Sequence, residues 1–287
     1  MKHYILYYII SFISIFNFTS SFAQAGDTLI LSDLQLDKNS PAGFSELNIP
    51  SGGSLLQGFI YKANGPGKHP TLLLLHGYPG NEKNLDLAQV VRAHGWNVIY
   101  FDYRGSWASQ GTFSFRNCVE DVVNLVSYCK RSSKSLQIDT SRIALFGHSM
   151  GGWVCLEALK LLPGIKKGFA LSTWDIYDNV KFATSGNQID RMIKEADNYF
   201  VLNKTSGKEL FAPVLNDPSY YDLKQAGTAL ENKQIIMLDE HPLNKTVADA
   251  ISKTNKSYFI YEVWPTDHPF TNKRVSLMKK VIAFLDR

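Results

Sequence analysis

Short apolar segments alternate with helical segments along most of the chain, and this alternation constrains the fold more than any other feature. Thr71–Leu75 is a continuous apolar run, typical of a strand that is buried on both faces. We expect further strands at 96–101, 142–146, 167–171, 234–238 and 258–263, and helices at 85–94, 119–131, 153–162 and 273–285. Strands separated by helices predict an α/β fold with a mostly parallel central sheet and helices on both faces.

Two segments depart from this alternation. Glu46–Ile49 and Leu55–Tyr61 flank a Pro-Ser-Gly-Gly turn, which predicts an antiparallel hairpin at the N-terminal end of the domain. Between about 174 and 232 the sequence offers only helical fragments, Ile189–Phe200 and Gly207–Leu215, joined by polar connectors. That interval is too long for an ordinary crossover, so we expect a small helical lid above the carboxyl ends of the strands.

The first residues have the character of a targeting segment. Lys2 precedes an apolar run from Tyr4 to Phe18, and small residues follow up to Ala23. This pattern predicts a cleavable signal peptide at 1–23 and a domain at 24–287. The run is short for a membrane span, so we expect no stable membrane insertion after cleavage and a protein exported to the periplasm or medium of a bacterium.

Composition narrows the classes of partner. The chain has 287 residues, of which 45% are apolar, enough for one large core. A formal net charge of +4 is too mild and too evenly spread to indicate a nucleic-acid partner. The cysteines Cys118, Cys129 and Cys155 lack metal-ligand spacing and are odd in number, although a Cys118–Cys129 disulfide stays open.

A strand–turn–helix segment carries a candidate nucleophile. Gly147-His148-Ser149-Met150-Gly151 matches the pattern Gly-x-Ser-x-Gly, with an expected strand directly before it and an expected helix directly after. Such a frame holds a serine on a sharp turn, where the glycines prevent side-chain collisions and the helix N-terminus favours negative charge. We therefore predict that Ser149 is a nucleophile.

The base and the oxyanion donors follow from chain order. A serine needs a base to accept its proton, and His268 lies after the last strand, with His241 as the fallback. An oxyanion hole needs two backbone N–H groups. We expect one from Met150, directly after the nucleophile, and one from Tyr78 in the loop His76–Gly80, where Gly77 permits close approach.

Together these residues resemble the α/β-hydrolase superfamily, and the match looks closest to its prolyl-oligopeptidase-like and dienelactone-hydrolase-like branch. The landmarks are 76–80, 101–105 with Ser109 and Gly111, 147–152 and 267–270. The resemblance implies an ester or amide hydrolase that uses neither a metal nor an organic cofactor. It also implies that Asp102 and Arg104 are structural supports.

The third catalytic residue is where the sequence departs from that pattern. The family usually has a Gly after the penultimate strand and an Asp a few residues later, but here the strand runs directly into Asp239-Glu240-His241-Pro242. We expect Asp239 to be the acid, with Glu240 and Asp175 as alternatives and a weakened triad also open. Asp267 adjoins the base too closely to turn back onto it, and we expect it to fix the loop.

These residues predict acyl transfer through a Ser–His–acid mechanism, with a small-molecule ester or short peptide as substrate. Dedicated oligopeptidases of the branch carry a large N-terminal propeller for which this chain has no room. We therefore favour a carboxylesterase over a small peptidase. A binding protein that kept the fold and lost the chemistry is the rival from another class, and the unusual acid loop is its support.

Overall fold

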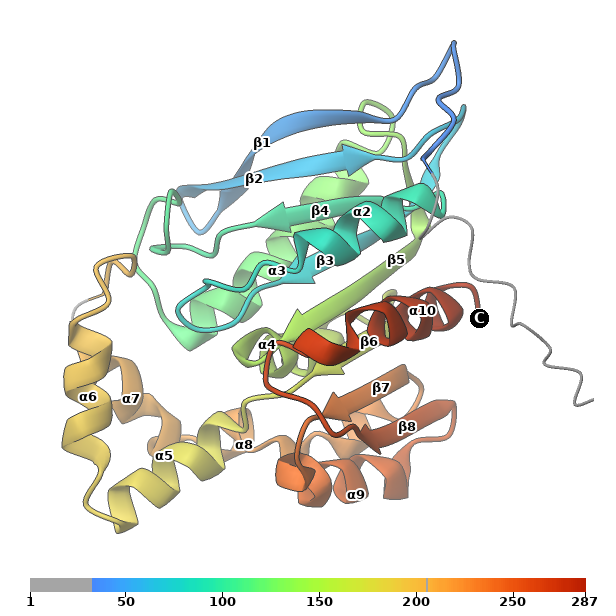
Figure 1. Cartoon of the computed structure of the whole chain (residues 1–287). Helices are drawn as coiled ribbons and strands as arrows, with labels where there is room; N and C mark the ends of the chain where they lie inside the picture. Colours follow the sequence, from blue (N-terminus) through green and yellow to red (C-terminus); the bar gives the residue numbers. More distant parts are fainter. Residues whose placement is uncertain (1–32, 205) are drawn as a thin grey trace, which may run out of the picture.

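The computed structural model describes residues 33–204 and 206–287, in which eight strands form one sheet (Figure 1). The predicted signal peptide lies outside the described residues. The strand order is β1-β2-β4-β3-β5-β6-β7-β8. The strands are β1 (Gly43–Ser51), β2 (Ser54–Lys62), β3 (His69–Leu75), β4 (Asn97–Phe101), β5 (Ile138–His148), β6 (Lys167–Leu171), β7 (Gln234–Asp239) and β8 (Tyr258–Val263).

The pairing of the strands confirms the predicted sheet. β1 pairs with β2 and β2 with β4 in antiparallel fashion, whereas every pair from β4 through β8 is parallel. The N-terminal hairpin thus extends one edge of a parallel sheet. Because β3 and β5 are neighbours and their connections leave in opposite directions, the loops that follow them diverge and leave space for a ligand at that edge.

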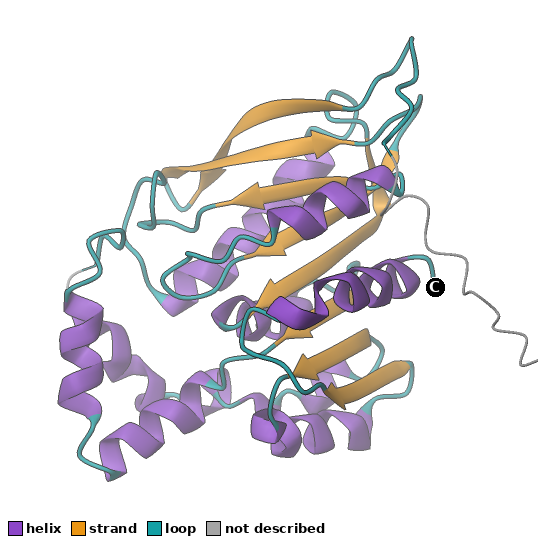
Figure 2. Cartoon of the chain, in the orientation of Figure 1, coloured by secondary structure: helices purple, strands orange, loops and turns teal. Residues whose placement is uncertain are grey.

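Helices cover both faces of the sheet (Figure 2). The apolar sides of α2 and α10 pack on one face, and those of α3, α4 and α9 pack on the other. The helices of the two layers are α2 (Leu85–Ala93), α10 (Arg274–Leu285), α3 (Phe115–Arg131), α4 (Met150–Leu161) and α9 (Lys245–Thr254), with the 3₁₀ turns η3 (Pro242–Asn244) and η4 (Thr271–Lys273) before α9 and α10.

The apolar run in β3 shows why the sheet needs both layers. Leu73 and Leu75 belong to the core on the α3 and α4 side, and Leu72 and Leu74 belong to the core under α2 and α10. All four side chains are at most 2% exposed. Alternation along a strand sends successive side chains to opposite faces, so burial of each leucine, worth about 1.5–3 kcal/mol, depends on both layers.

Some element boundaries differ from those expected from sequence. α3 begins at Phe115 because Ser114 caps it, its hydroxyl accepting a hydrogen bond from the Asn117 N–H at 3.1 Å. α9 was not predicted, although Val247, Ala248 and Ile251 give it a buried side. The three cysteines are buried and unpaired, so the Cys118–Cys129 disulfide does not form.

The interval between β6 and β7 is helical, as predicted, and lies beside the carboxyl end of the sheet (Figure 1). Its elements are α5 (Ile176–Ser185), α6 (Ile189–Asp197), α7 (Gly207–Asn216), α8 (Pro218–Tyr221), η1 (Leu223–Gln225) and η2 (Gly227–Leu230). The segment before α7 is tied to the sheet domain, because Trp107 N–H donates to Val201 O at 2.8 Å. In the part of the chain that the structure describes, no helix is both long and apolar enough to span a membrane.

Candidate active site

Ser149 lies on a sharp turn between β5 and α4. Its backbone has φ 60° and ψ −119°, a left-handed conformation that a serine adopts only when its surroundings enforce it. Two hydrogen bonds hold the turn: Ser149 N–H donates to Leu171 O at 2.8 Å, and Trp174 N–H donates to Ser149 O at 3.0 Å. The end of β6 therefore fixes the position of the serine.

The glycines around Ser149 are required by space. A Cβ on Gly147 would lie 1.9 Å from Gly151 O, and a Cβ on Gly151 would lie 2.0 Å from Leu75 O. A Cβ on Gly77, in the loop after β3, would lie 3.1 Å from Ser149 Cβ. The loop after β3 thus runs directly against the serine, as the neighbouring positions of β3 and β5 require.

This contact places the loop that carries Tyr78 beside the turn that carries Met150. Met150 is the first residue of α4, so its N–H has no acceptor within the helix. Within the described residues, neither the Met150 N–H nor the Tyr78 N–H donates to another backbone carbonyl. Both N–H groups therefore remain free to bind an oxygen atom near Ser149.

His268 lies in the loop after β8 and pairs with Glu240, not with Asp239. His268 Nδ1–H donates to Glu240 Oε1 at 2.8 Å. The expectation that Asp239 holds the base is corrected here. Burial alone would raise the pKa of Glu240, but hydrogen bonds from His268 and Ser172 outweigh it and lower the pKa to about 2. Glu240 is thus an anion at neutral pH.

Asp239 also lines the pocket that holds Ser149, but its carboxylate turns away from His268, toward the face of the sheet that α9 covers. Its carboxylate accepts hydrogen bonds from Asn244 Nδ2 at 3.0 Å and from the Tyr261 hydroxyl at 2.9 Å. Asp239 pairs with Val263 in the β7–β8 register, so Tyr261 is its diagonal neighbour on the α9 face. Burial raises the pKa of Asp239 to about 6. Glu240 follows on the alternate side, the side from which α10 and His268 approach.

The other candidates for the acid do not contact His268. Asp175 caps α5, accepting the Asp178 N–H at 3.1 Å, and His241 is exposed and does not line the pocket that holds Ser149. Asp267 fixes its own loop as expected, since its Oδ1 accepts the Thr271 N–H at 2.7 Å.

The landmark residues after β4 are structural, as the resemblance implied. Arg104 Nε donates to Asp121 Oδ1 at 2.7 Å, and the Tyr100 hydroxyl donates to Asp102 Oδ1 at 2.7 Å. Neither Asp102 nor Arg104 lines the pocket beside Ser149.

Two further residues support the site and carry no sequence signature of their own. His148 Nε2–H donates to the backbone oxygen of His268 at 3.0 Å, and the two rings lie 4.8 Å apart. Burial, followed by the nearby His268, lowers the pKa of His148 to about 4, so His148 is neutral near pH 7. The Ser172 hydroxyl donates to Glu240 Oε2. Both contacts join segments far apart in the chain.

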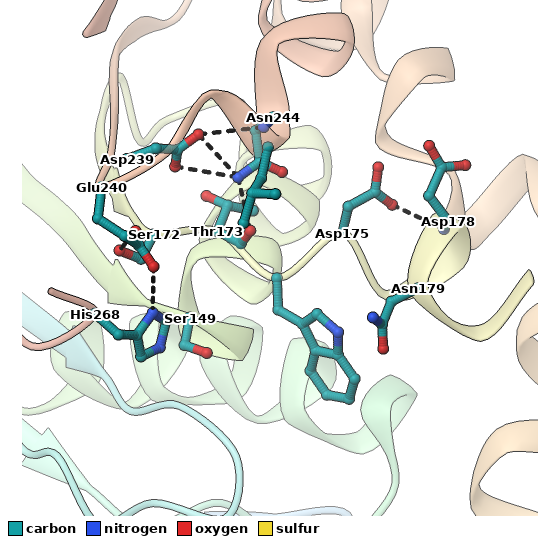
Figure 3. Close-up of a pocket in the computed structure, with 12 residues that line it drawn as sticks. Ser149, Ser172, Thr173, Asp175, Asp178, Asn179, Asp239, Glu240, Asn244 and His268 are labelled. Carbon is teal, nitrogen blue, oxygen red and sulfur yellow. Dashed lines mark hydrogen bonds and ion pairs between the residues drawn. The ribbon is translucent and has the colours of Figure 1, made fainter. Parts of the chain in front are cut away.

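Ser149, His268 and Glu240 line one pocket of about 270 Å³ (Figure 3). In the figure these three lie together, while Asp175, Asp178 and Asn179 lie at the other side of the pocket. Trp174 and Leu243 add apolar surface, and the other lining residues have polar side chains. In the described residues, no group of three or more His, Cys, Asp or Glu side chains is arranged to hold a metal ion.

Comparisons with known proteins identify the family of this chain. Residues 67–232, more than half of the chain, match the family described as serine aminopeptidase, S33. The uncharacterized protein YfhR of Escherichia coli K12 is 30% identical over 169 residues, which cover 56% of this chain and 55% of YfhR. The lysophosphatidylserine lipase ABHD12 of Danio rerio is 30% identical over 105 residues, 36% of this chain and 26% of ABHD12. The chain thus spans less than two thirds of either relative.

A solved structure shows the same fold. An esterase of Pyrobaculum calidifontis superposes with a TM-score of 0.65 at 12% identity, covering 90% of this chain and 87% of that one. With the sheet order and the family match, this likeness fixes the superfamily. The chain is a member of the serine aminopeptidase S33 family of hydrolases, within the α/β-hydrolase superfamily.

Proposed function

We propose that this protein is a serine hydrolase that cleaves a carboxylic ester through an acyl-enzyme intermediate. The observation that carries the proposal is the hydrogen bond between His268 and Glu240. Both residues line the same pocket as Ser149, whose backbone is strained. Glu240 takes the role that sequence analysis gave to Asp239. Membership in a family of hydrolases supports the proposal.

In this mechanism Ser149 Oγ attacks the ester carbonyl while His268 Nε2 accepts its proton. Glu240 holds the proton on His268 Nδ1, which leaves Nε2 free as the base, and stabilises the imidazolium that forms. The N–H groups of Tyr78 and Met150 bind the oxyanion. His268 then protonates the leaving alcohol, and water releases the acyl group from Ser149 by the same route.

The pocket favours a small, polar substrate. A volume of about 270 Å³ is just under the lower end of the range for small-molecule sites, roughly 300 Å³. Its wall away from Ser149 carries Asp175, Asp178 and Asn179 rather than a row of apolar side chains. We therefore propose short acyl esters of polar alcohols as the first substrates to test.

A specific observation keeps peptidase activity as the second candidate. Asp175 and Asp178 line the pocket, and a carboxylate there can pair with the ammonium group of an aminoacyl substrate. The family description names an aminopeptidase. A binding protein without chemistry requires that Ser149 be unreactive.

Comparing turnover of p-nitrophenyl acetate and of aminoacyl p-nitroanilides tests the choice of bond. We expect the acetate to turn over faster, with activity lost in Ser149→Ala. Faster anilide turnover would reverse the order of the two candidates, and turnover that survives Ser149→Ala would refute the mechanism.

We also propose that the protein is exported after removal of residues 1–23. N-terminal sequencing of protein from the periplasm and medium would test for cleavage after Ala23.

A further inference from the structure

We propose that Ser172 is a positioning residue that holds Glu240 in register with His268. The inference rests on the proposed function and deepens it by adding a fourth member to the Ser149–His268–Glu240 set. Ser172 follows β6 directly, is 5% exposed, and donates its hydroxyl to Glu240 Oε2. The other carboxylate oxygen, Oε1, accepts the His268 Nδ1–H at 2.8 Å.

Each oxygen of Glu240 thus has its own side-chain donor. A glutamate has three rotatable side-chain bonds, and one hydrogen bond leaves the carboxylate free to turn about the axis of that bond. A second donor on the other oxygen removes this freedom. The carboxylate plane, and with it the imidazole that it orients, is then fixed before substrate arrives.

The backbone of Ser172 indicates that this contact is maintained against strain. Ser172 has φ +44°, in the left-handed region where glycine is the residue most easily accommodated. Its N–H donates to Leu238 O at 2.7 Å, two residues before Glu240. Backbone and side chain of Ser172 therefore bind Leu238 and Glu240 at the end of β7, from a serine whose backbone conformation would suit glycine better.

The same segment also positions the nucleophile. Leu171 O, one residue before Ser172, accepts the Ser149 N–H at 2.8 Å. Residues 171 and 172 thus link the backbone of Ser149 on one side to the carboxylate of Glu240 on the other. This one segment therefore sets the distance between Ser149 and Glu240 in the proposed Ser149–His268–Glu240 set.

Loss of the hydroxyl should reduce the chemical step more than substrate binding, because the Ser172 hydroxyl is engaged by Glu240. Ser172→Gly is the informative variant, since it removes the hydroxyl and relieves the left-handed backbone at once. We expect kcat for the ester to fall about tenfold, KM to stay within about twofold, and Tm to stay near that of the wild type. Ser172→Ala should lower kcat similarly and also lower Tm.

Gln137→Gly is the matched control. Gln137 has φ +54° and directly precedes β5, at the opposite end of the sheet, so the substitution relieves a similar backbone without touching the site. We expect wild-type kcat from this variant. Wild-type kcat in both Ser172→Gly and Ser172→Ala would overturn the proposal.

A double-mutant cycle with Glu240→Gln asks whether Ser172 acts through Glu240. The acylation burst is measured in the single variants, the double variant and the wild type, since it detects slow enzymes. We expect Ser172→Gly to have less than a twofold effect once Glu240 is Gln. Fully additive effects would overturn the proposal while leaving Ser149 and His268 intact, whereas turnover that survives Ser149→Ala would overturn the proposed function as well.

Discussion

The two ends of the central sheet both carry a hollow, but they use their polar groups differently. At the carboxyl end, Ser149 and Ser172 both have positive φ, and the pocket beside them measures about 270 Å³. At the amino end, a larger pocket of about 390 Å³ lies between β5, β6 and the C-terminus. There Lys167 Nζ donates to Phe284 O and Leu285 O, at 3.2 and 2.6 Å.

The volume of a pocket therefore does not by itself identify a functional site. Lys167 binds the last carbonyls of α10, which is ordinary satisfaction of a helix end by a cation. At the carboxyl end, by contrast, two serines with positive φ and the His268–Glu240 pair line a single pocket. We therefore expect substitution of Ser149 or Glu240 at the carboxyl end to reduce activity with little effect on stability, and substitutions away from that end to do the reverse.

The largest expected effect is that of Ser149→Ala. Removing the proposed nucleophile should lower kcat by roughly three or more decades, and Tm should stay within a few degrees because the Ser149 side chain makes no hydrogen bond among the described residues. Esterase assays and a thermal melt on the same preparation check both statements. Substantial activity in this variant would contradict the assignment of the activity to the pocket at the carboxyl end.

Glu240→Gln and Asp239→Asn form the next test, because the two carboxylates are neighbours in sequence. Glu240→Gln should lower kcat by about two to three decades, since the amide would favour the wrong tautomer of His268. Asp239→Asn should lower kcat by less than about tenfold, because Asp239 contacts Asn244 and Tyr261 instead. The reverse order of effects would return the role of the acid to Asp239.

Glu157→Gln tests a buried acid outside the pocket. Glu157 lies on α4, is 1% exposed, and binds Lys160 at 2.6 Å. Burial raises its pKa to about 7 from 4.5, only partly offset by Lys160. The folded state therefore holds the proton more tightly, so this carboxyl favours folding below about pH 4.5, and the benefit is lost as pH rises through 7.

A glutamine at this position does not titrate, so the variant does not lose this stability as pH rises. The free energy of unfolding of Glu157→Gln, relative to that of the wild type, should therefore increase by about 2 kcal/mol between pH 5 and pH 8, because only the wild type loses stability over this range. Urea denaturation at both pH values measures the change, and kcat at pH 8 should match that of the wild type. A difference that is independent of pH would show that Glu157 is ionised in the folded protein.

The smallest expected effect is that of Lys167→Met at the amino end. Loss of the donor to Phe284 O and Leu285 O should lower stability by about 1 kcal/mol, or about 2–4 °C in Tm. Activity should not change. A clear loss of kcat with unchanged Tm would assign a functional role to the amino-end pocket and contradict the comparison.

The sequence could predict those parts of the site that have a local signature. The turn at Ser149 is specified by its own glycines, and His268 follows from chain order after the last strand. The acid could not be chosen, because Asp239 and Glu240 face opposite sides of β7. Which side meets the base is known only once α9 and α10 are placed. The same holds for Ser172, whose partner Glu240 is 68 residues away.

The sequence predicted the fold more completely than the site. The alternation of apolar strands and helices predicted the sheet, its hairpin and the helical insertion. α9 was missed although the apolar spacing of Val247, Ala248 and Ile251 carries the signal, because the short segment begins in a turn at Pro242. Helix starts such as Phe115 depend on caps that a periodicity search does not detect.

The most direct test of Ser149 as the proposed nucleophile is the intact mass of the protein after treatment with a fluorophosphonate, followed by peptide mapping. A reactive serine forms a covalent adduct with this probe only when a base activates it. We expect one adduct per chain, on the peptide that contains Ser149. The adduct should be absent from Ser149→Ala and should form far more slowly in Glu240→Gln than in Asp239→Asn. An unlabelled wild-type protein, or an adduct on another serine, would contradict it.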